Sequence, residues 1–154
     1  MTAPMFSKVL VICIGNICRS PMAAAMLRQQ GPAGLQVRSA GLAACVGQDM
    51  DPLALQVLGA EAVEHLPHSA SQLTEAMLRW ADLVLVMDHQ QWKSVTRHAP
   101  YVLGKTFLIG KWRDDLEIAD PYRRPLSAFQ QTYAHLGFCI EGWLPYLSFE
   151  DQEK

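Results

Sequence analysis

The sequence has little net charge and no long apolar run. Its 13 lysines and arginines and 15 aspartates and glutamates give a formal net charge of −2, whereas a nucleic-acid binder would show a basic excess. No apolar segment has the length of a transmembrane helix, which argues against membrane insertion. The segment Met1–Ser7 also lacks the charged and apolar regions of a signal peptide, so we expect a cytoplasmic protein.

Cysteine is scarce, with only Cys13, Cys18, Cys45 and Cys139 among the 154 residues. Structural disulfides are rare in a reducing compartment. The spacing of Cys13 and Cys18 is not the two-residue gap of zinc knuckles or thioredoxin sites, and no second cysteine–histidine pair would complete a tetrahedral zinc site. We therefore expect no metal and no cofactor, and we interpret Cys45 and Cys139 as ordinary thiols.

Short apolar runs alternate with longer segments of helical character. The apolar runs predict strands over residues 8–12, 35–39, 83–87 and 106–109. The longer segments predict helices over residues 20–30, 52–58, 71–80, 89–98 and 126–147. This alternation predicts an α/β fold with one domain over residues 1–154, in which a four-stranded parallel sheet has helices on both faces and forms a three-layer sandwich.

Polar residues mark where several of these helices begin. Ser20 is predicted as the N-cap of the first helix, with Pro21 in its first position. Ser71 and Glu75 form an imperfect capping box for the helix over residues 71–80. Asp88 is predicted to cap the helix over residues 89–98.

The segment Val9–Pro21 contains the strongest functional pattern in the chain. A buried strand leads into Cys13, a short loop with one glycine follows, and Arg19 stands where an apolar helix begins. A helix N-terminus presents backbone N–H groups and a positive dipole, which together favour a bound phosphate. The same environment, with an arginine nearby, stabilises the thiolate form of cysteine, so Cys13 is a candidate nucleophile aimed at phosphorus.

Other polar residues follow the predicted strands at the same edge of the sheet. Ser39 ends the second strand, Asp88 follows the third, and the charged loop that contains Asp120 follows the fourth. Ligands of parallel sheets bind beyond the carboxyl ends of the strands. We therefore expect Cys13 and these three residues to lie at one edge of the molecule.

The active-site loop of the low-molecular-weight protein tyrosine phosphatases resembles the run Cys13-Ile14-Gly15-Asn16-Ile17-Cys18-Arg19-Ser20-Pro21. Three further segments extend the resemblance over nearly the whole chain: Ser39-Ala40-Gly41, residues 81–88, and Asp120-Pro121-Tyr122. The bacterial branch is most similar. The resemblance implies a monomeric phosphatase whose partner is a phosphotyrosine protein, in particular a tyrosine kinase with a tyrosine-rich tail from capsule or exopolysaccharide export.

The resemblance also assigns roles to residues of the loop. Cys13 is the nucleophile, and the planar guanidinium of Arg19 binds two phosphate oxygens. Ser20 has two compatible readings, as a helix cap and as a donor to the thiolate. Loop amides hold the remaining phosphate charge, without a metal, and they come from Ile14, Gly15, Asn16, Ile17, Cys18 and Arg19. Asn16 fixes the loop backbone with Ser39 and His68 as partners, although from sequence alone His68 reads as an exposed loop histidine.

Asp120 is the predicted general acid, because a phenolate leaves poorly unless its oxygen is protonated. The residues alone do not single it out, since Asp114, Asp115 and Glu117 lie close by in the sequence. Asp51 precedes a proline as well, but it has a structural explanation as a helix cap. The match to the family's Asp-Pro-Tyr motif selects Asp120.

The walls of the predicted pocket come from two segments. Tyr122 is expected to stack on a substrate ring, with a partly buried loop tyrosine as the alternative reading. The family often has a second tyrosine where this chain has Arg123, which favours acidic residues around the phosphotyrosine. The opposite wall is expected from residues 42–49, where this chain lacks the aromatic residue that many relatives have.

Three alternatives remain open at this level. Cys18 forms a reversible disulfide with Cys13 under oxidation, as the resemblance implies, or it is a small packing residue. Arsenate reduction on the same scaffold would need a further cysteine pair, which Cys45 and Cys139 do not form in the sequence. A non-catalytic phosphotyrosine-binding module is the third possibility, although such a module would not need a nucleophile and an acid.

Overall fold

A computed structural model describes residues 5–63 and 68–148. Its four strands form one parallel sheet with the order β2-β1-β3-β4. The strands are β1 (Lys8–Cys13), β2 (Gln36–Gly41), β3 (Leu83–Val86) and β4 (Thr106–Leu108). The predicted four-stranded parallel sheet is confirmed, although β2 begins one residue later than expected and continues to Gly41.

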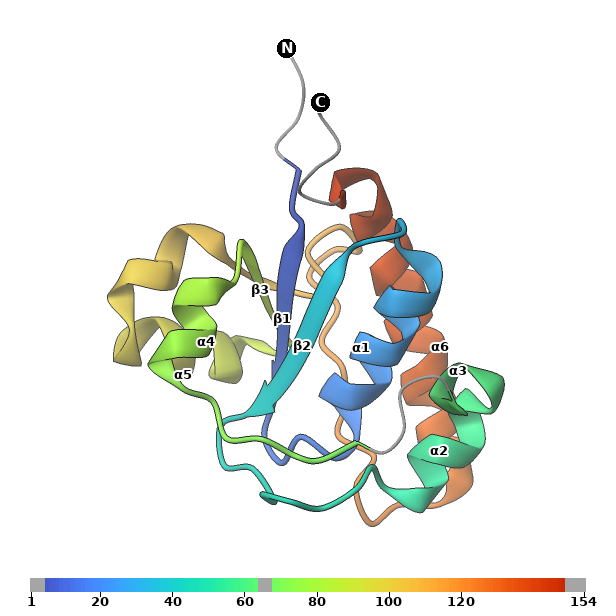
Figure 1. The fold of residues 1–154 in the computed structure, drawn as a ribbon. Coiled ribbons are helices and arrows are strands. Elements are labelled where there is room, and N and C mark those ends of the chain that lie inside the picture. Colours follow the sequence, from blue (N-terminus) through green and yellow to red (C-terminus); the bar gives the residue numbers. More distant parts are fainter. Residues whose placement is uncertain (1–4, 64–67, 149–154) are drawn as a thin grey trace.

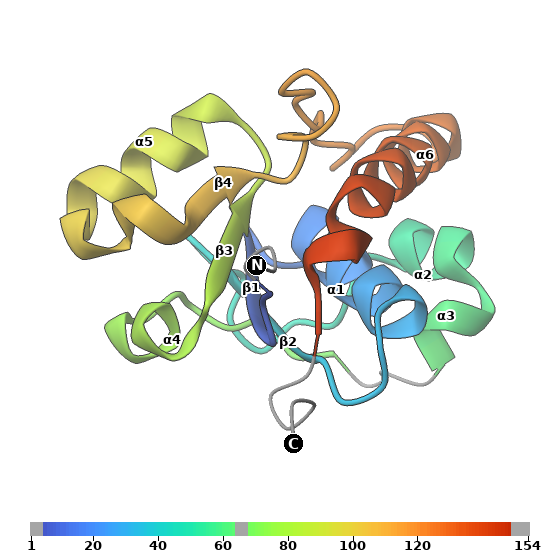
Figure 2. The same cartoon turned by 90° about the horizontal axis from the view of Figure 1, so that it is seen from above.

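Helices cover both faces of the sheet, as Figures 1 and 2 show. One face carries α1 (Arg19–Gln30), α2 (Pro52–Leu58), α3 (Ala60–Val63) and α6 (Leu126–Trp143). The other face carries α4 (Glu75–Trp80) and α5 (His89–His98). Because side chains alternate along a strand, Val9 and Val11 of β1 pack with the larger helical layer, while Leu10 and Ile12 pack with the smaller one.

The start of α4 differs from the prediction. The sequence predicts a helix from Ser71, but α4 begins at Glu75, and the Thr74 side chain accepts a hydrogen bond from the Met77 amide. The preceding segment is extended because it pairs with the end of β2, where the Gly41 amide donates to the Ser71 carbonyl over 2.9 Å. The predicted capping box of Ser71 and Glu75 is therefore wrong.

One other helix boundary and two short helical segments also differ from the prediction. The last helix ends at Trp143 rather than at residue 147, and a 3-10 turn over Leu144–Tyr146 follows, because Pro145 has no amide hydrogen to continue the α-helix. Neither α3 nor the 3-10 segment Pro100–Lys105 was predicted. Among residues 5–63 and 68–148, no helix is both long and apolar enough to cross a bilayer.

Two of the four predicted caps are present. The carboxylates of Asp51 and Asp88 accept hydrogen bonds from the first turns of α2 and α5. Ser20 is not a cap, because α1 begins at Arg19 and its N-cap position is Cys18, which makes no side-chain capping bond. The Ser20 hydroxyl lies inside the first turn and does not cap the helix.

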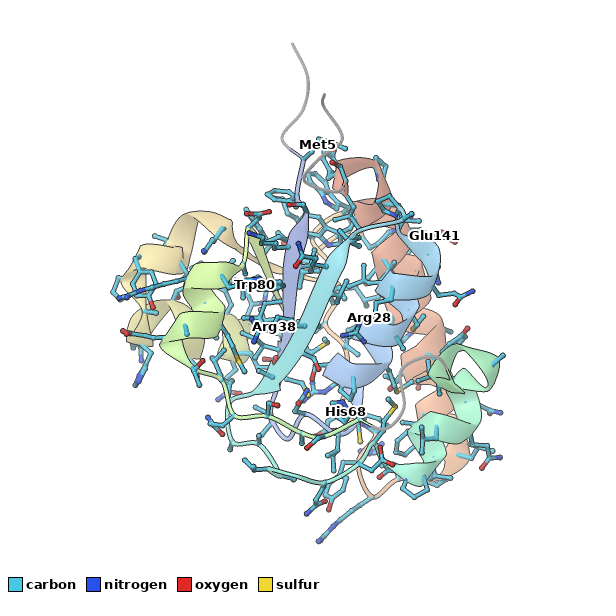
Figure 3. The ribbon with its side chains drawn as sticks, in the orientation of Figure 1. Met5, Arg28, Arg38, His68, Trp80 and Glu141 are labelled. Carbon is cyan, nitrogen blue, oxygen red and sulfur yellow. The ribbon has the colours of Figure 1, made fainter. Side chains whose placement is uncertain are left out.

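The exposed edge strand β2 is shielded by cationic side chains on both of its faces. The Arg38 guanidinium lies 4.8 Å from the centroid of the Trp80 ring in α4. On the α1 side, Arg28 donates to the Val37 carbonyl over 2.6 Å, and Figure 3 labels both arginines beside β2. Such charged groups discourage strand pairing with another chain.

Candidate active site

The loop between β1 and α1 has its carbonyl groups directed outward. The carbonyls of Cys13, Ile14, Gly15 and Ile17 each accept a hydrogen bond of 2.9 Å from a backbone amide outside the loop. The donors are Leu42, Ala43, Cys45 and Asp51. The fifth carbonyl, that of Asn16, accepts from His68 Nε2 over 2.7 Å. The chain after β2 therefore supports every peptide of the loop.

The amides of the loop point the opposite way. In a trans peptide the N–H of a residue is antiparallel to the preceding carbonyl, so the amides of residues 14–18 are directed into the loop. None of these amides donates to another group in the part of the chain that the structure describes. Together with the positive end of the α1 dipole, they form an anion-binding concavity.

Cys13 lies at the base of this concavity, at the end of β1. Its sulfur is 3.0 Å from the Ser20 hydroxyl oxygen, and both side chains are buried. The Asn16 amide nitrogen donates to the same hydroxyl oxygen over 2.7 Å, so it occupies one of the acceptor positions of Ser20. When Cys13 is a thiolate it can only accept, so the Ser20 hydroxyl then donates to the sulfur and stabilises its negative charge.

Asn16 connects the loop to the rest of the molecule. It is fully buried and has a φ of 60°, a left-handed conformation that asparagine tolerates better than most residues. Besides its bond to Ser20, its amide nitrogen donates to Ser39 Oγ over 3.0 Å, and its amide oxygen accepts from the Ser71 amide over 2.9 Å. Ser71 was not predicted as a partner of Asn16.

His68 does not have the exposed position that the sequence alone favours. It is half-buried and donates to the Asn16 carbonyl, and Figure 3 places it below α1 at the loop end of the sheet. Its position shows that the segment after residue 67 returns to the active-site end of the molecule.

Arg19 is buried between acidic and carbonyl groups. Its Nη1 donates to the Ile118 carbonyl over 2.8 Å and lies 3.7 Å from Asp88 Oδ2, while its Nη2 lies 3.7 Å from Asp120 Oδ2. Both nitrogen–oxygen distances are near the upper limit for an ion pair, and both are too long for a hydrogen bond. The guanidinium thus has a fixed orientation and donor capacity left for an anion.

Asp120 and Tyr122 lie at the mouth of a pocket of about 170 Å³ above the loop. The Asp120 side chain is 49% exposed, and its Oδ1 accepts a hydrogen bond from the Tyr122 amide over 3.1 Å. Tyr122 is 45% exposed. The pocket is lined by Cys13, Ile14, Gly15, Ile17, Cys18, Arg19, Ala43, Cys45, Asp120 and Tyr122.

The wall opposite Tyr122 differs in part from the expectation. Of the predicted segment 42–49, only Ala43 and Cys45 line the pocket, while Leu42 packs with the smaller core layer. Cys45 is therefore not the unremarkable thiol that the sequence suggests. The position of Cys45 shortly after β2 could have indicated this role. Gly41 must be glycine because a Cβ there would overlap the Ile14 carbonyl, and this close approach aligns residues 42–45 with the loop.

Cys18 shares the pocket with Cys13, but its environment is different. Burial raises the pKa of the Cys18 thiol far above its ordinary value, and the negative charges of Asp51 and Asp120 raise it further. Cys18 therefore remains a neutral thiol. Burial likewise raises the pKa of Cys139 in α6 to about 11. All four cysteines are free thiols, and within the described ranges no three His, Cys, Asp or Glu residues are grouped to hold a metal.

Comparisons with known proteins agree with this architecture. The family model "Low molecular weight phosphotyrosine protein phosphatase" matches residues 8–153. The chain is 41% identical over 141 residues to the "Probable low molecular weight protein-tyrosine-phosphatase EpsP" of Ralstonia nicotianae, covering 92% of this chain and 96% of that protein.

Solved structures share the fold. The tyrosine phosphatase amsI of Erwinia amylovora matches with a TM-score of 0.85 and 39% identity over 96% of this chain and 97% of its own. The YwlE arginine phosphatase of Geobacillus stearothermophilus matches with a TM-score of 0.81 and 31% identity over 90% of both chains. With its loop, its buried arginine and its matched length, this chain belongs to the low molecular weight phosphotyrosine protein phosphatase family.

Proposed function

We propose that this protein hydrolyses phosphotyrosine in a protein substrate through a phosphocysteine intermediate. The observation that carries the proposal is the orientation of the loop, whose five outward carbonyls leave the amides of residues 14–18 directed into the concavity at Cys13, where a phosphate would bind. Ile14, Ile17 and Tyr122 add apolar surface that suits an aromatic ring.

In the first step the Cys13 thiolate attacks phosphorus, the bond from phosphorus to the tyrosine oxygen breaks, and Asp120 gives its proton to that oxygen. In the second step Asp120 accepts a proton from water, which attacks the phosphocysteine and releases phosphate and the Cys13 thiolate. Arg19 and the loop amides bind the phosphoryl oxygens in both steps. The Ser20 hydroxyl stabilises the thiolate as it leaves.

The physiological substrate we propose is the phosphorylated, tyrosine-rich tail of a tyrosine kinase of capsule or exopolysaccharide export. The supporting observation is the 41% identity to the Ralstonia protein EpsP. Incubation of the purified phosphatase with the phosphorylated kinase tail, followed by mass spectrometry of each tyrosine, tests this assignment.

The nucleophile is tested with Cys13→Ser. This variant should lose turnover of para-nitrophenyl phosphate and retain affinity for inorganic phosphate, because the loop amides and Arg19 are unchanged. Turnover by the serine variant would sink the phosphocysteine mechanism. Cys45→Ser is the matched control: Cys45 is also a pocket thiol, but it lies on the wall and should not be required for turnover.

The acid is tested with Asp120→Asn. Tyrosine has a pKa of about 10 and leaves poorly without a proton, whereas para-nitrophenol leaves readily. The variant should therefore lose about 10²- to 10⁴-fold on phosphotyrosine and much less on para-nitrophenyl phosphate. The control is Asp114→Asn, an exposed carboxylate in a left-handed conformation that asparagine also accepts. Equal losses of rate on both substrates would show that another residue is the general acid.

Two other reactions are distinguished with the same protein. Phosphoarginine is offered because one structural relative is an arginine phosphatase, and faster turnover of phosphoarginine than of phosphotyrosine peptides would overturn the proposed substrate class. Thiol-dependent reduction of arsenate would indicate the alternative reaction. That reaction needs two further thiols near Cys13; Cys18 and Cys45 line the same pocket, whereas Cys139 is buried within α6, so the arsenate assay and not the cysteine count separates the two reactions.

A further inference from the structure

Next to Tyr122 of the pocket lining, the chain has two arginines that the reaction does not use. Arg123 and Arg124 directly follow Tyr122, and both are exposed. Within residues 5–63 and 68–148, neither guanidinium forms an ion pair with a carboxylate. The opposite wall, formed by Ala43 and Cys45, carries no charge, so the positive charge at the mouth lies on one side.

Arg123 is held beside the substrate ring site. Its Cζ lies 5.3 Å from the centroid of the Tyr122 ring, which itself lines the pocket. A cation over a tyrosine face is attracted by the ring, so the guanidinium stays near the mouth while its N–H donors remain available. This contact places the Arg123 guanidinium beside a residue of the pocket lining.

The backbone at Arg123 is unfavourable for an arginine. The Arg124 amide donates to the Pro121 carbonyl over 2.9 Å, and Arg123 has a φ of 65°. A β-turn with a positive φ only at its third residue is type II, which prefers glycine or asparagine at that position. Arginine in a left-handed conformation costs about 1 kcal/mol or more, so the turn itself does not explain this residue.

Resting on the proposed phosphotyrosine activity, we propose that Arg123 and Arg124 determine substrate specificity by binding acidic side chains next to the phosphotyrosine. An extended peptide advances about 3.3 Å per residue. A guanidinium about 5 Å from the Tyr122 ring therefore faces a residue roughly one or two positions from the phosphotyrosine. An aspartate or glutamate side chain at those positions would accept hydrogen bonds from the guanidinium N–H groups of Arg123 and Arg124.

The test uses three phosphotyrosine peptides that differ only in the flanking residues, which are glutamate, glutamine or lysine. Wild-type kcat/KM should be about three- to tenfold higher for the glutamate peptide than for the glutamine peptide, the range expected for two exposed ion pairs, and lowest for the lysine peptide. Raising the salt from 0.05 to 1 M should remove most of this preference.

The variants are Arg123→Asn, which keeps a residue suited to the left-handed turn, and Arg124→Gln. Each should reduce the glutamate-to-glutamine ratio, and the double variant should bring it close to one. Arg97→Gln removes an exposed charge from the last turn of α5 and should leave the ratio unchanged. A ratio of one in the wild type, or a ratio that survives in the double variant, would overturn the inference.

A failure of this inference is distinguishable from a failure of the proposed function. If the wild type hydrolyses all three peptides at equal rates, the phosphatase assignment stands and only the role of the arginines is lost. If it hydrolyses neither the peptides nor para-nitrophenyl phosphate, the proposed function fails as well. Calorimetric binding of the glutamate and glutamine peptides to Cys13→Ser measures the same preference without turnover.

Discussion

Replacement of Asn16 by alanine should lower the free energy of unfolding far more than replacement of Ser39, a polar residue that binds Asn16. Asn16 is completely buried, and its side chain donates to Ser20 and Ser39 and accepts from the Ser71 amide. Alanine removes all three hydrogen bonds and leaves the Ser71 N–H without that acceptor. The hydroxyls of Ser20 and Ser39 can rotate to other partners, whereas a backbone amide cannot.

The expected loss follows from these contacts. Each hydrogen bond contributes about 1 kcal/mol, and a left-handed alanine costs about 1 kcal/mol more than a left-handed asparagine or glycine. We therefore expect Asn16→Ala to lower the free energy of unfolding by about 4 kcal/mol. Asn16→Gly should lose somewhat less, about 3 kcal/mol, since glycine tolerates a φ of 60°. Ser39→Ala removes one of the three bonds and should lose about 1 kcal/mol.

Urea denaturation of the three variants measures these differences directly. Activity on para-nitrophenyl phosphate should fall in the same order, because Asn16 also orients the Ser20 hydroxyl toward Cys13. If Asn16→Ala and Ser39→Ala were equally stable, Asn16 would not be the residue that connects the loop to the fold. If Asn16→Gly were no more stable than Asn16→Ala, the left-handed backbone at position 16 would not contribute to the loss of stability.

Three further predictions concern other parts of the molecule. Arg19→Lys should lower kcat/KM on para-nitrophenyl phosphate by at least tenfold, because an ammonium lacks the planar pair of donors, and a near-normal value would refute bidentate phosphate binding. Hydrogen bonds from His89 lower the pKa of Glu117. Glu117→Gln should therefore lower the free energy of unfolding by less than 1 kcal/mol above about pH 4.5. Urea denaturation at several pH values should show that this difference vanishes as the pH falls below that value. Gly142→Ala should lower the melting temperature by several degrees, because its Cβ would lie 2.7 Å from the Trp112 Cβ, and an unchanged melting temperature would show that Trp112 moves freely.

The central strands and the starts of two helices could be predicted from local sequence patterns. The buried run before Cys13, the apolar run at residues 83–86 and the capping aspartates Asp51 and Asp88 specify their own conformations, since burial and capping act within a few residues. The predicted order of strands and helices followed from them. The extra helical turns of α3 and of Pro100–Lys105 escaped prediction, because such short segments carry little periodicity.

The errors occurred where distant parts of the chain compete for the same backbone groups. Ser71 has the composition of a helix cap, yet its amide binds the Asn16 side chain and its carbonyl binds the end of β2, so the helix begins later. Ser20 likewise has the composition of a cap, but Asn16 and Cys13 take its hydroxyl. Local propensity does not register these partners: those of Ser71 are 30 and 55 positions away, and those of Ser20, although only 4 and 7 positions away, lie in a loop whose shape is set by the chain after β2.

Residue identity and spacing are enough to find the groups suited to the chemistry: a thiol at the end of a buried strand, an arginine at a helix start and a carboxylate in a late loop. How these groups are oriented depends on contacts between distant segments of the fold. The outward carbonyls of the loop depend on amides supplied by residues 42–51, and the pocket wall depends on the close approach at Gly41. Composition and spacing identify donors and acceptors, whereas hydrogen-bond direction depends on which segments the fold brings together.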